Sequence, residues 1–121
     1  MVSSLSDDFD SNYDLFIEDA VATGCVWGLE NADGWALCSS NESDTLEILP
    51  LWSQPEFAQV QCVGDWQTYR VVPISLEELL DDWLPGLHED LLLVGPNWTA
   101  SLEGLEVEPL DMAEEFDAVI D

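Results

Sequence analysis

Three polar residues could do chemistry in this chain: Arg70, His88 and Asn97. Arg70 is the only Lys or Arg, and its guanidinium could clamp a carboxylate or phosphate, although an ion pair between two acidic elements is the favoured interpretation. His88 is the only histidine and stands beside Glu89 and Asp90, where a cationic imidazole suits a helix end better than catalysis. With Asn97, these two residues form the candidate ligand set of a small-molecule or metal-dependent enzyme.

The other signals for catalysis are negative. Cys25, Cys38 and Cys62 are odd in number and form no C-x-x-C pair, which favours free buried thiols in a reducing cytoplasm. None has the electropositive surroundings that a reactive thiolate needs, and one histidine is too few for a zinc site. The chain also lacks a glycine-rich phosphate loop and a G-x-S-x-G elbow. We therefore assign no catalytic residue, no metal and no cofactor, and lean against an enzyme.

Oxygen-bearing side chains follow one another at the spacing of a calcium loop near the start of the chain: Asp8, Asp10, Asn12, Asp14 and Asp19. Such a loop needs a sharp turn that glycine normally makes, and here Tyr13 stands in its place. Tyr13 also begins an apolar stripe at helical spacing, so a helix with a solvated acidic face is the favoured interpretation.

Carboxylates dominate the composition, with 27 Asp and Glu against one Arg and a net charge of −26. Such a charge repels nucleic acid and anionic membranes but steers a basic protein toward the surface. Acidic helix faces are expected within residues 7–19, 77–82 and 103–115, and they supply the candidate contacts Asp10, Asp14, Glu18, Glu77, Glu78, Asp81, Asp82, Asp111, Glu114 and Glu115. Trp66 and Trp98, expected at loop edges, would add aromatic anchors.

Two interpretations of this charge stay open. In the first, a non-enzymatic binding or accessory domain engages a basic partner, in its most concrete form by mimicking DNA with carboxylates in place of phosphates. In the second, the charge only keeps the protein hydrated in a salty cytoplasm and is unrelated to the ligand. Composition does not predict the oligomeric state.

The central elements are expected within residues 67–98. Tyr69 to Ile74 suits a strand, and Ser75 with Glu78 forms a capping box that opens a helix. Pro85 and Gly86 should stop that helix or tighten it into an irregular last turn. A continuous apolar run at residues 91–94 then predicts a second strand, so the three elements form a compact βαβ-type unit.

The flanking elements follow from the same signals. An amphipathic helix should end near Gly24, followed by a hairpin of residues 25–30 and 35–39 and a third strand at residues 46–51. Ser53 should cap the next helix through a second capping box with Glu56. Residues 105–107 suit a short strand, and Pro109 opens a C-terminal helix whose buried stripe is expected to be Met112, Ala113, Phe116, Val119 and Ile120.

These elements predict an α+β fold in which one mixed sheet of about five strands is flanked by about four helices. Residues 1–11 should form a loose acidic N-terminus and residues 12–121 a single domain, because 47% hydrophobic residues suffice for one core. No signal peptide or membrane-spanning run is apparent, which favours the cytoplasm.

From about Phe16 to Phe116 the sequence resembles an uncharacterised bacterial family, the domain of unknown function 2750, in four blocks: VWGLENADGWAL, ILPLWSQPEFA, YRVVPISLEELLDDWLPGLHEDLLLVGPNW and EVEPLDMAEEF. This resemblance implies a small bacterial cytoplasmic α+β domain without an established activity or cofactor. More loosely, the Pro-Leu-Trp strand, the Ser-capped helix and the strand-helix-strand unit ending in an Asn-containing loop are similar to the N-terminal domain of SseB-like secretion accessory proteins.

Overall fold

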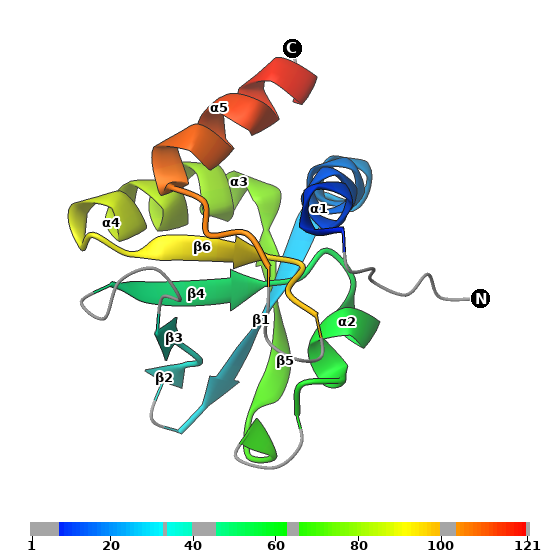
Figure 1. Cartoon of the computed structure of the whole chain (residues 1–121), viewed down its shortest axis with the longest axis vertical. Helices are drawn as coiled ribbons and strands as arrows, with labels where there is room; N and C mark the ends of the chain where they lie inside the picture. Colours follow the sequence, from blue (N-terminus) through cyan, green and yellow to red (C-terminus); the bar gives the residue numbers. More distant parts are fainter. Residues whose placement is uncertain (1–7, 33, 40–45, 63–65, 100–103, 121) are drawn as a thin grey trace.

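The computed structural model describes residues 8–32, 34–39, 46–62, 66–99 and 104–120 (Figure 1). Its elements follow in the order α1 (Phe9–Thr23), β1 (Cys25–Asn31), β2 (Gly34–Trp35), β3 (Cys38–Ser39), β4 (Glu47–Leu51), α2 (Pro55–Gln59), β5 (Arg70–Ser75), α3 (Leu76–Glu78), the π-helical segment η2 (Leu79–Trp83), α4 (Leu84–Glu89), β6 (Leu93–Pro96) and α5 (Pro109–Ile120). The predicted α+β class is confirmed.

The strands divide between two three-stranded sheets and do not form one mixed sheet. The first has the order β2-β1-β5 and is antiparallel throughout; in the second, β4 pairs antiparallel with β3 and parallel with β6. The chain crosses from one sheet to the other between Trp35 and Cys38, within the segment expected to be one hairpin strand. Among the residues that the structure describes, one bridge joins the sheets, where Trp27 and Trp52 exchange backbone hydrogen bonds of 2.7 and 2.8 Å.

The strands of the predicted βαβ-type unit belong to different sheets, so this prediction was wrong in its pairing. β5 runs antiparallel to β1 from Cys25 opposite Ser75 to Glu30 opposite Arg70. β6 instead pairs with β4, placing the ends of two parallel strands side by side after Leu51 and Pro96. The helices between β5 and β6 therefore connect the two sheets.

The connection between β5 and β6 is one helical run, residues 76–89, that continues through Pro85 and Gly86. At its start the Ser75 hydroxyl accepts from the Glu78 N–H at 3.1 Å, which confirms the predicted cap. The Glu78 carboxylate accepts from the Ser75 hydroxyl at 3.2 Å, and not from the Ser75 backbone amide as in a capping box. The Leu84 N–H donates to the Leu79 carbonyl, five residues back. Because a proline ring clashes with the carbonyl four residues before it, this wider π turn lets the helix pass Pro85.

Helix α1 begins at Phe9, so residues 9–11, which were expected to belong to a loose N-terminus, are helical, and residues 1–7 lie outside the described ranges. Asp8 caps it by accepting from the Ser11 N–H at 3.2 Å, and the hydrogen bonds from Ser11 lower the pKa of Asp8. Gly24 ends it at φ +74°, with its N–H donating to Ala20 at 2.7 Å. A regular helix cannot wrap its carboxylates around calcium, so the helical interpretation is confirmed.

The second predicted capping box is wrong. Gln54, not Ser53, precedes α2 as its cap residue, and it makes no side-chain capping bond. The Ser53 hydroxyl is instead engaged by Asp19 and Asn97, which come from other elements. Hydrogen bonds to residues distant in the sequence thus replace the predicted capping bond of Ser53.

Helix α5 begins at Pro109 as predicted, but its buried stripe is shorter than expected. Met112 and Phe116 are fully buried, whereas Val119 and Ile120 are each 51% exposed. The helix leans away from the body of the protein toward its C-terminal end (Figure 1), in line with the exposure of Val119 and Ile120 in its last turn. The short strand expected at residues 105–107 reduces to one bridge between Val107 and Val94.

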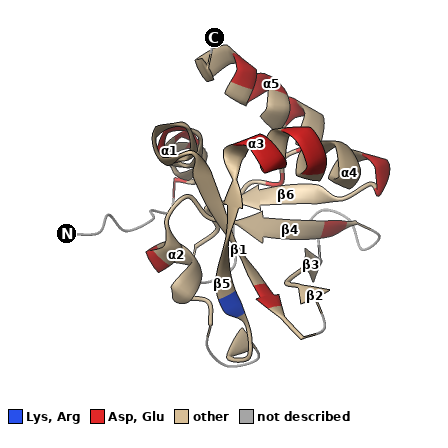
Figure 2. Ribbon diagram, turned by 180° about the vertical axis from the view of Figure 1, so that it is seen from behind, with Lys and Arg blue, Asp and Glu red and all other residues tan. Residues whose placement is uncertain are grey.

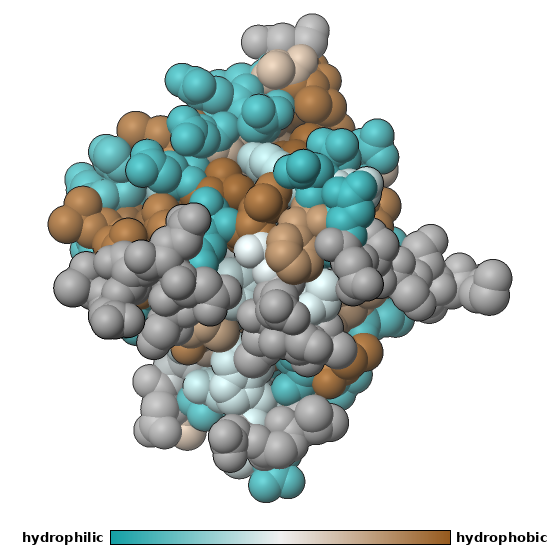
Figure 3. All heavy atoms as spheres, viewed as in Figure 1, coloured by the Kyte–Doolittle hydropathy of each residue, from teal (hydrophilic) through white to brown (hydrophobic). Residues whose placement is uncertain are grey.

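The core lies between the helices and the two sheets. Its main cluster joins α1, the α3–α4 run and α5 to the strands through Phe16, Leu49, Leu51, Leu79, Leu84, Met112 and Phe116. A second cluster surrounds Trp52 and Trp98. Hydrophilic residues gather over the helices on the face shown in Figure 3, with hydrophobic ones visible between them. Among the described residues, no helix has the length and apolar character to cross a membrane.

Candidate functional site

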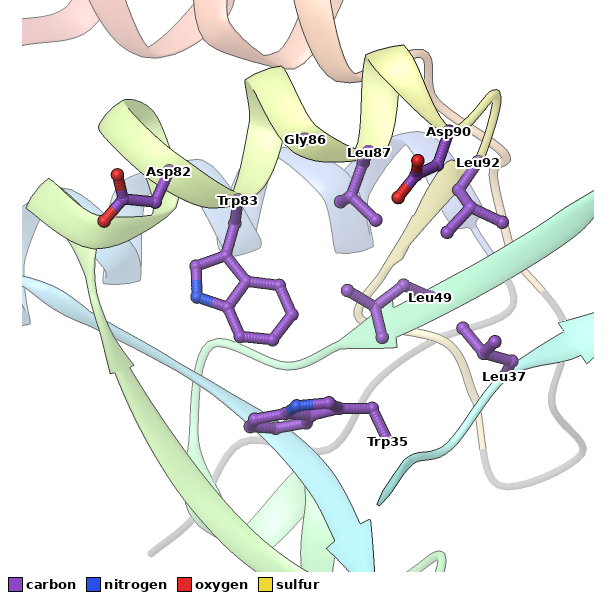
Figure 4. A pocket seen from close by; sticks show the side chains of 9 residues that line it. All are labelled: Trp35, Leu37, Leu49, Asp82, Trp83, Gly86, Leu87, Asp90 and Leu92. Atoms are coloured by element: carbon purple, nitrogen blue, oxygen red, sulfur yellow. The ribbon is translucent and has the colours of Figure 1, made fainter. Parts of the chain in front are cut away.

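A pocket of about 480 Å³ opens between the helical run of residues 76–89 and the strands beneath it (Figure 4). Its lining combines leucines, two tryptophans and two carboxylates: Trp35, Leu37, Leu49, Asp82, Trp83, Gly86, Leu87, Asp90 and Leu92. The pocket joins residues that are far apart in the sequence, from β2, β4, the helical run and the segment before β6.

Two tryptophans form one side of this pocket. Trp83 descends from the end of η2 toward Trp35 of β2, and their rings meet edge to face with centroids 4.8 Å apart and planes at 86°. The Trp35 ring also lies across β1 at Gly28, where an added Cβ would stand 2.9 Å from Cζ3 of that ring. Glycine in β1 thus permits the ring position that shapes the pocket.

The carboxylates lie toward opposite ends of the pocket. Asp82 comes from η2 and Asp90 follows α4, and in Figure 4 the Asp90 carboxylate is turned down toward the strands beside Leu87. Leucine and indole walls with carboxylates and no basic group suit a ligand with an aliphatic body and a positive charge. Among the described residues that line the pocket, none carries a thiol, hydroxyl or imidazole.

The predicted acidic contacts are all exposed. Figure 2 shows Asp and Glu on all the helices and the single Arg on β5. Glu77, Glu78, Asp81 and Asp82 stand together on the α3–η2 part of the helical run, while α1 and α5 carry the other two sets, Asp10, Asp14 and Glu18, and Asp111, Glu114 and Glu115. Asp82 alone belongs to both an acidic set and the pocket.

Asn97 is a structural residue, and its assignment as a ligand contact was wrong. It is fully buried after β6, where its side-chain carbonyl accepts from the Ser53 N–H at 2.8 Å. Its amide donates to the Ser53 hydroxyl at 3.0 Å and to the Asn12 carbonyl at 3.1 Å. Asp19 completes this network by accepting from the Ser53 hydroxyl at 2.9 Å. All the polar atoms of the Asn97 side chain are engaged inside the protein.

Trp98 is only 1% exposed, so the expectation of a loop-edge anchor was wrong. Its indole N–H donates to the Leu105 carbonyl at 2.8 Å, and its ring fills the space beside Gly95 and Gly104, where added Cβ atoms would collide with it. Trp66 is half-buried and meets Tyr69 edge to face at 5.6 Å, so part of its ring remains available for contact.

Arg70 and His88 lie in separate parts of the fold. Arg70 stands at the start of β5 with its side chain 78% exposed, and its guanidinium lies 3.5 Å from the Glu30 carboxylate of β1, as the ion-pair interpretation predicts. His88 is exposed in the last turn of α4, where it borders a small hollow with Leu91 and Glu108. The structure therefore does not assemble the three-residue ligand set Arg70, His88 and Asn97.

The cysteines are free and partly buried. Burial raises the pKa of Cys25, Cys62 and Cys38, and that of Cys38 reaches about 11. These thiols are poor nucleophiles at neutral pH. Within the described ranges, no group of three His, Cys, Asp or Glu side chains could hold a metal ion.

The pocket was missed by sequence reasoning, although a partial signal existed. Six tryptophans exceed what a core of this size needs, yet nothing local indicates that Trp35 and Trp83, 48 positions apart, share a cavity.

Comparison with curated proteins and with solved structures finds no match, and the resemblance to SseB-like domains stays a prediction. A family described as "Protein of unknown function (DUF2750)" matches residues 13–116. The chain therefore belongs to the DUF2750 family.

Proposed function

We propose that this domain is a non-enzymatic cytoplasmic binding module that recruits a basic partner protein through the helical run of residues 76–89. The observation that carries the proposal is the clustering of Glu77, Glu78, Asp81 and Asp82 as exposed side chains on this run, while the only Arg lies on β5. A surface with this charge accelerates encounters with a cationic patch and disfavours anionic partners.

The acidic set of the helical run differs from those of α1 and α5 because one of its carboxylates, that of Asp82, borders the pocket between Trp35 and Trp83. Trp83 follows Asp82 directly in the sequence. Charge alone gives weak, salt-sensitive attraction at an exposed surface, whereas desolvated aromatic contacts supply most of the binding energy in protein interfaces. The combination of charge and an apolar pocket favours the binding of a specific partner over the alternative, in which the charge only keeps the protein hydrated in a salty cytoplasm.

The partner class that fits this surface best is a protein whose own site is built for a polyanion. Glu77 and Asp81 lie one helical turn apart, as do Glu78 and Asp82, so their carboxylates form two short rows. Such rows can occupy the lysines and arginines of a DNA-binding protein in place of phosphates. Mimicry of DNA is therefore the concrete form of the proposal.

The test is capture of partners from lysate by the wild-type protein and two charge-matched variants, at low and high salt and with nuclease. Glu77→Gln with Asp81→Asn removes two charges from the helical run, and Asp14→Asn with Glu18→Gln removes two from α1. Neither pair includes a capping or pocket residue. We expect the first variant to recover a nuclease-resistant DNA-binding protein about fivefold less well at low salt and the second to match the wild type within about twofold. Equal recovery by all three proteins would contradict the proposed surface.

A further inference from the structure

We propose that the pocket between Trp35 and Trp83 receives one lysine or arginine side chain of the partner. This inference rests on the function proposed above and specifies what the partner must insert. The aliphatic stem would lie against Leu49, Leu87 and Leu92, and the cationic head would be placed by the carboxylate of Asp90, which is turned down toward the strands beside Leu87.

The volume and lining of the pocket support a partly apolar side chain as the occupant. Its volume of about 480 Å³ exceeds the space needed by one side chain and its hydration. Trp83 and Trp35 meet edge to face, which leaves indole surface toward the cavity, and the leucines on the helical run and on β4 complete the apolar walls. Lysine and arginine side chains lie along apolar surfaces in this way while keeping the charged head in water.

The charges of the lining exclude the other classes of occupant. An anionic group would meet Asp82 and Asp90 without a compensating cation, since no basic residue lines the pocket. A neutral apolar side chain would contact the leucines but would leave the charge of the exposed carboxylates at the rim unmatched. A cationic head meets that charge and gains further from the indole rings, which attract cations to their faces.

Gly86 provides a way to block the pocket without changing its charge. It lines the pocket within α4, and a Cβ added there would meet no atom within 4 Å, so a larger side chain at this position enters open space. Gly86→Leu is therefore expected to extend into the pocket while leaving every carboxylate in place. Gly86→Ala is the matched control, because it makes the same backbone change with a single methyl group.

The probes are two peptides of equal charge, a decamer of lysine and a decamer of 2,4-diaminobutyrate, whose side chains are two methylenes shorter. Their affinities for the full chain are measured by calorimetry at low salt. We expect the wild-type protein and Gly86→Ala to prefer the lysine decamer about three- to fivefold, because only its stems reach past the rim to the indoles. Gly86→Leu should bind both decamers equally.

A second pair of variants tests the charge inside the pocket independently of its volume. Asp90→Asn and Glu89→Gln each remove one charge from adjacent exposed positions at the end of α4, but only Asp90 lines the pocket. Asp90→Asn should lower the lysine-decamer affinity about threefold and Glu89→Gln by less than half as much. Retention of the lysine preference by Gly86→Leu, or equal effects of the two charge variants, would overturn the pocket assignment.

The failure of this inference can be told apart from the failure of the proposed function. If the wild-type protein binds both decamers equally but Glu77→Gln with Asp81→Asn weakens both, the acidic surface stands and the pocket assignment is wrong. If that variant binds both decamers like the wild type, the surface itself is wrong. The Glu77→Gln, Asp81→Asn variant and the variants at Gly86 and Asp90 change different groups, because neither Glu77 nor Asp81 lines the pocket.

Discussion

The Asn97 side chain binds both the backbone and the side chain of Ser53, through hydrogen bonds of 2.8 and 3.0 Å between residues 44 positions apart. This double contact locks together the ends of the parallel strands β4 and β6, and the bond to the Asn12 carbonyl adds α1. In parallel sheets such strand ends commonly carry ligand sites. Here their polar groups satisfy one another, so the strand ends serve stability.

Asn97→Ala should lower the free energy of unfolding by about 3 kcal/mol, because it leaves buried partners without hydrogen bonds and puts a Cβ-bearing residue into an αL conformation without a compensating side-chain bond. Asn97 has φ +47°. Urea denaturation measures the loss. Asn97→Gly removes the same bonds but tolerates this φ, so it should be more stable than Asn97→Ala by about 1 kcal/mol. Equal stability of these variants and the wild type would show that the network contributes nothing.

Gly95→Ala should destabilise the protein by about 1–3 kcal/mol, because the added methyl would lie 2.5 Å from Cε2 of the buried Trp98 ring. That ring cannot easily move away, since its N–H is bound to the Leu105 carbonyl. Gly86→Ala is the control in open space, where replacing a helical glycine should stabilise by about 0.5–1 kcal/mol. Thermal unfolding should therefore shift in opposite directions for the two alanine variants, and shifts of the same sign would contradict the packing described for Trp98.

Two charge reversals on α5 test how the helix dipole acts within this acidic protein. Asp117→Lys and Asp111→Lys change the net charge equally, but Asp111 lies in the first turn and Asp117 near the end. A cation near the C-terminal end is favourable and one in the first turn is not. We expect Asp117→Lys to be the more stable of the two by about 1 kcal/mol in dilute buffer. The gap should shrink in 1 M KCl, and a gap that grows with salt would exclude an electrostatic origin.

Tyr13→Phe should be neutral or stabilising at pH 7, because the Tyr13 hydroxyl is buried and makes no hydrogen bond to any residue of the described ranges. Burial, with the nearby carboxylates of Glu115, Asp111 and Asp14, raises the pKa of Tyr13. In the unfolded chain the Tyr13 phenol ionises near its ordinary pKa of about 10, whereas in the folded protein it keeps its proton. The free energy of unfolding of the wild type is therefore fully present below that pH and falls as the pH rises above it.

Unfolding of the wild type and Tyr13→Phe is to be compared at pH 7 and at pH 10.5. The wild type should lose more stability between these values than the variant, which has no phenol at this position to ionise. The cysteines and Tyr69 are common to both proteins, so their titration cancels in the difference. A loss that is identical in the two proteins would contradict the buried phenol.

The parts of the fold that could be predicted are those decided by neighbours in the chain. Ser75 with Glu78, Gly24 and Pro109 mark helix ends through local hydrogen bonds or backbone conformation, and all three were placed correctly. The pairing of β5 with β1 could not be derived this way, because an apolar run indicates a strand but not its partner. Ser53 shows the same limit, since its hydroxyl bonds to Asn97 and Asp19 and does not cap α2.

The sequence predicts the charge of the candidate site but not the presence of its pocket. Exposure of the carboxylates follows directly from helical periodicity. The burial of Trp98 depends on Gly95 and on Gly104, which make room for the indole only once the chain has folded back. The pocket similarly depends on the approach of Trp83 to Trp35 across two elements, and no spacing along the chain encodes that approach.

The single arginine has a practical consequence for proteolysis. Trypsin cleaves after lysine or arginine, so this chain offers it one bond, between Arg70 and Val71. That bond lies within β5, which is paired along its length with β1. Cleavage requires the start of β5 to separate from β1, and its rate reports how often this end of the sheet opens. Because one cut yields two fragments, the rate at which they appear measures local unfolding at a single site.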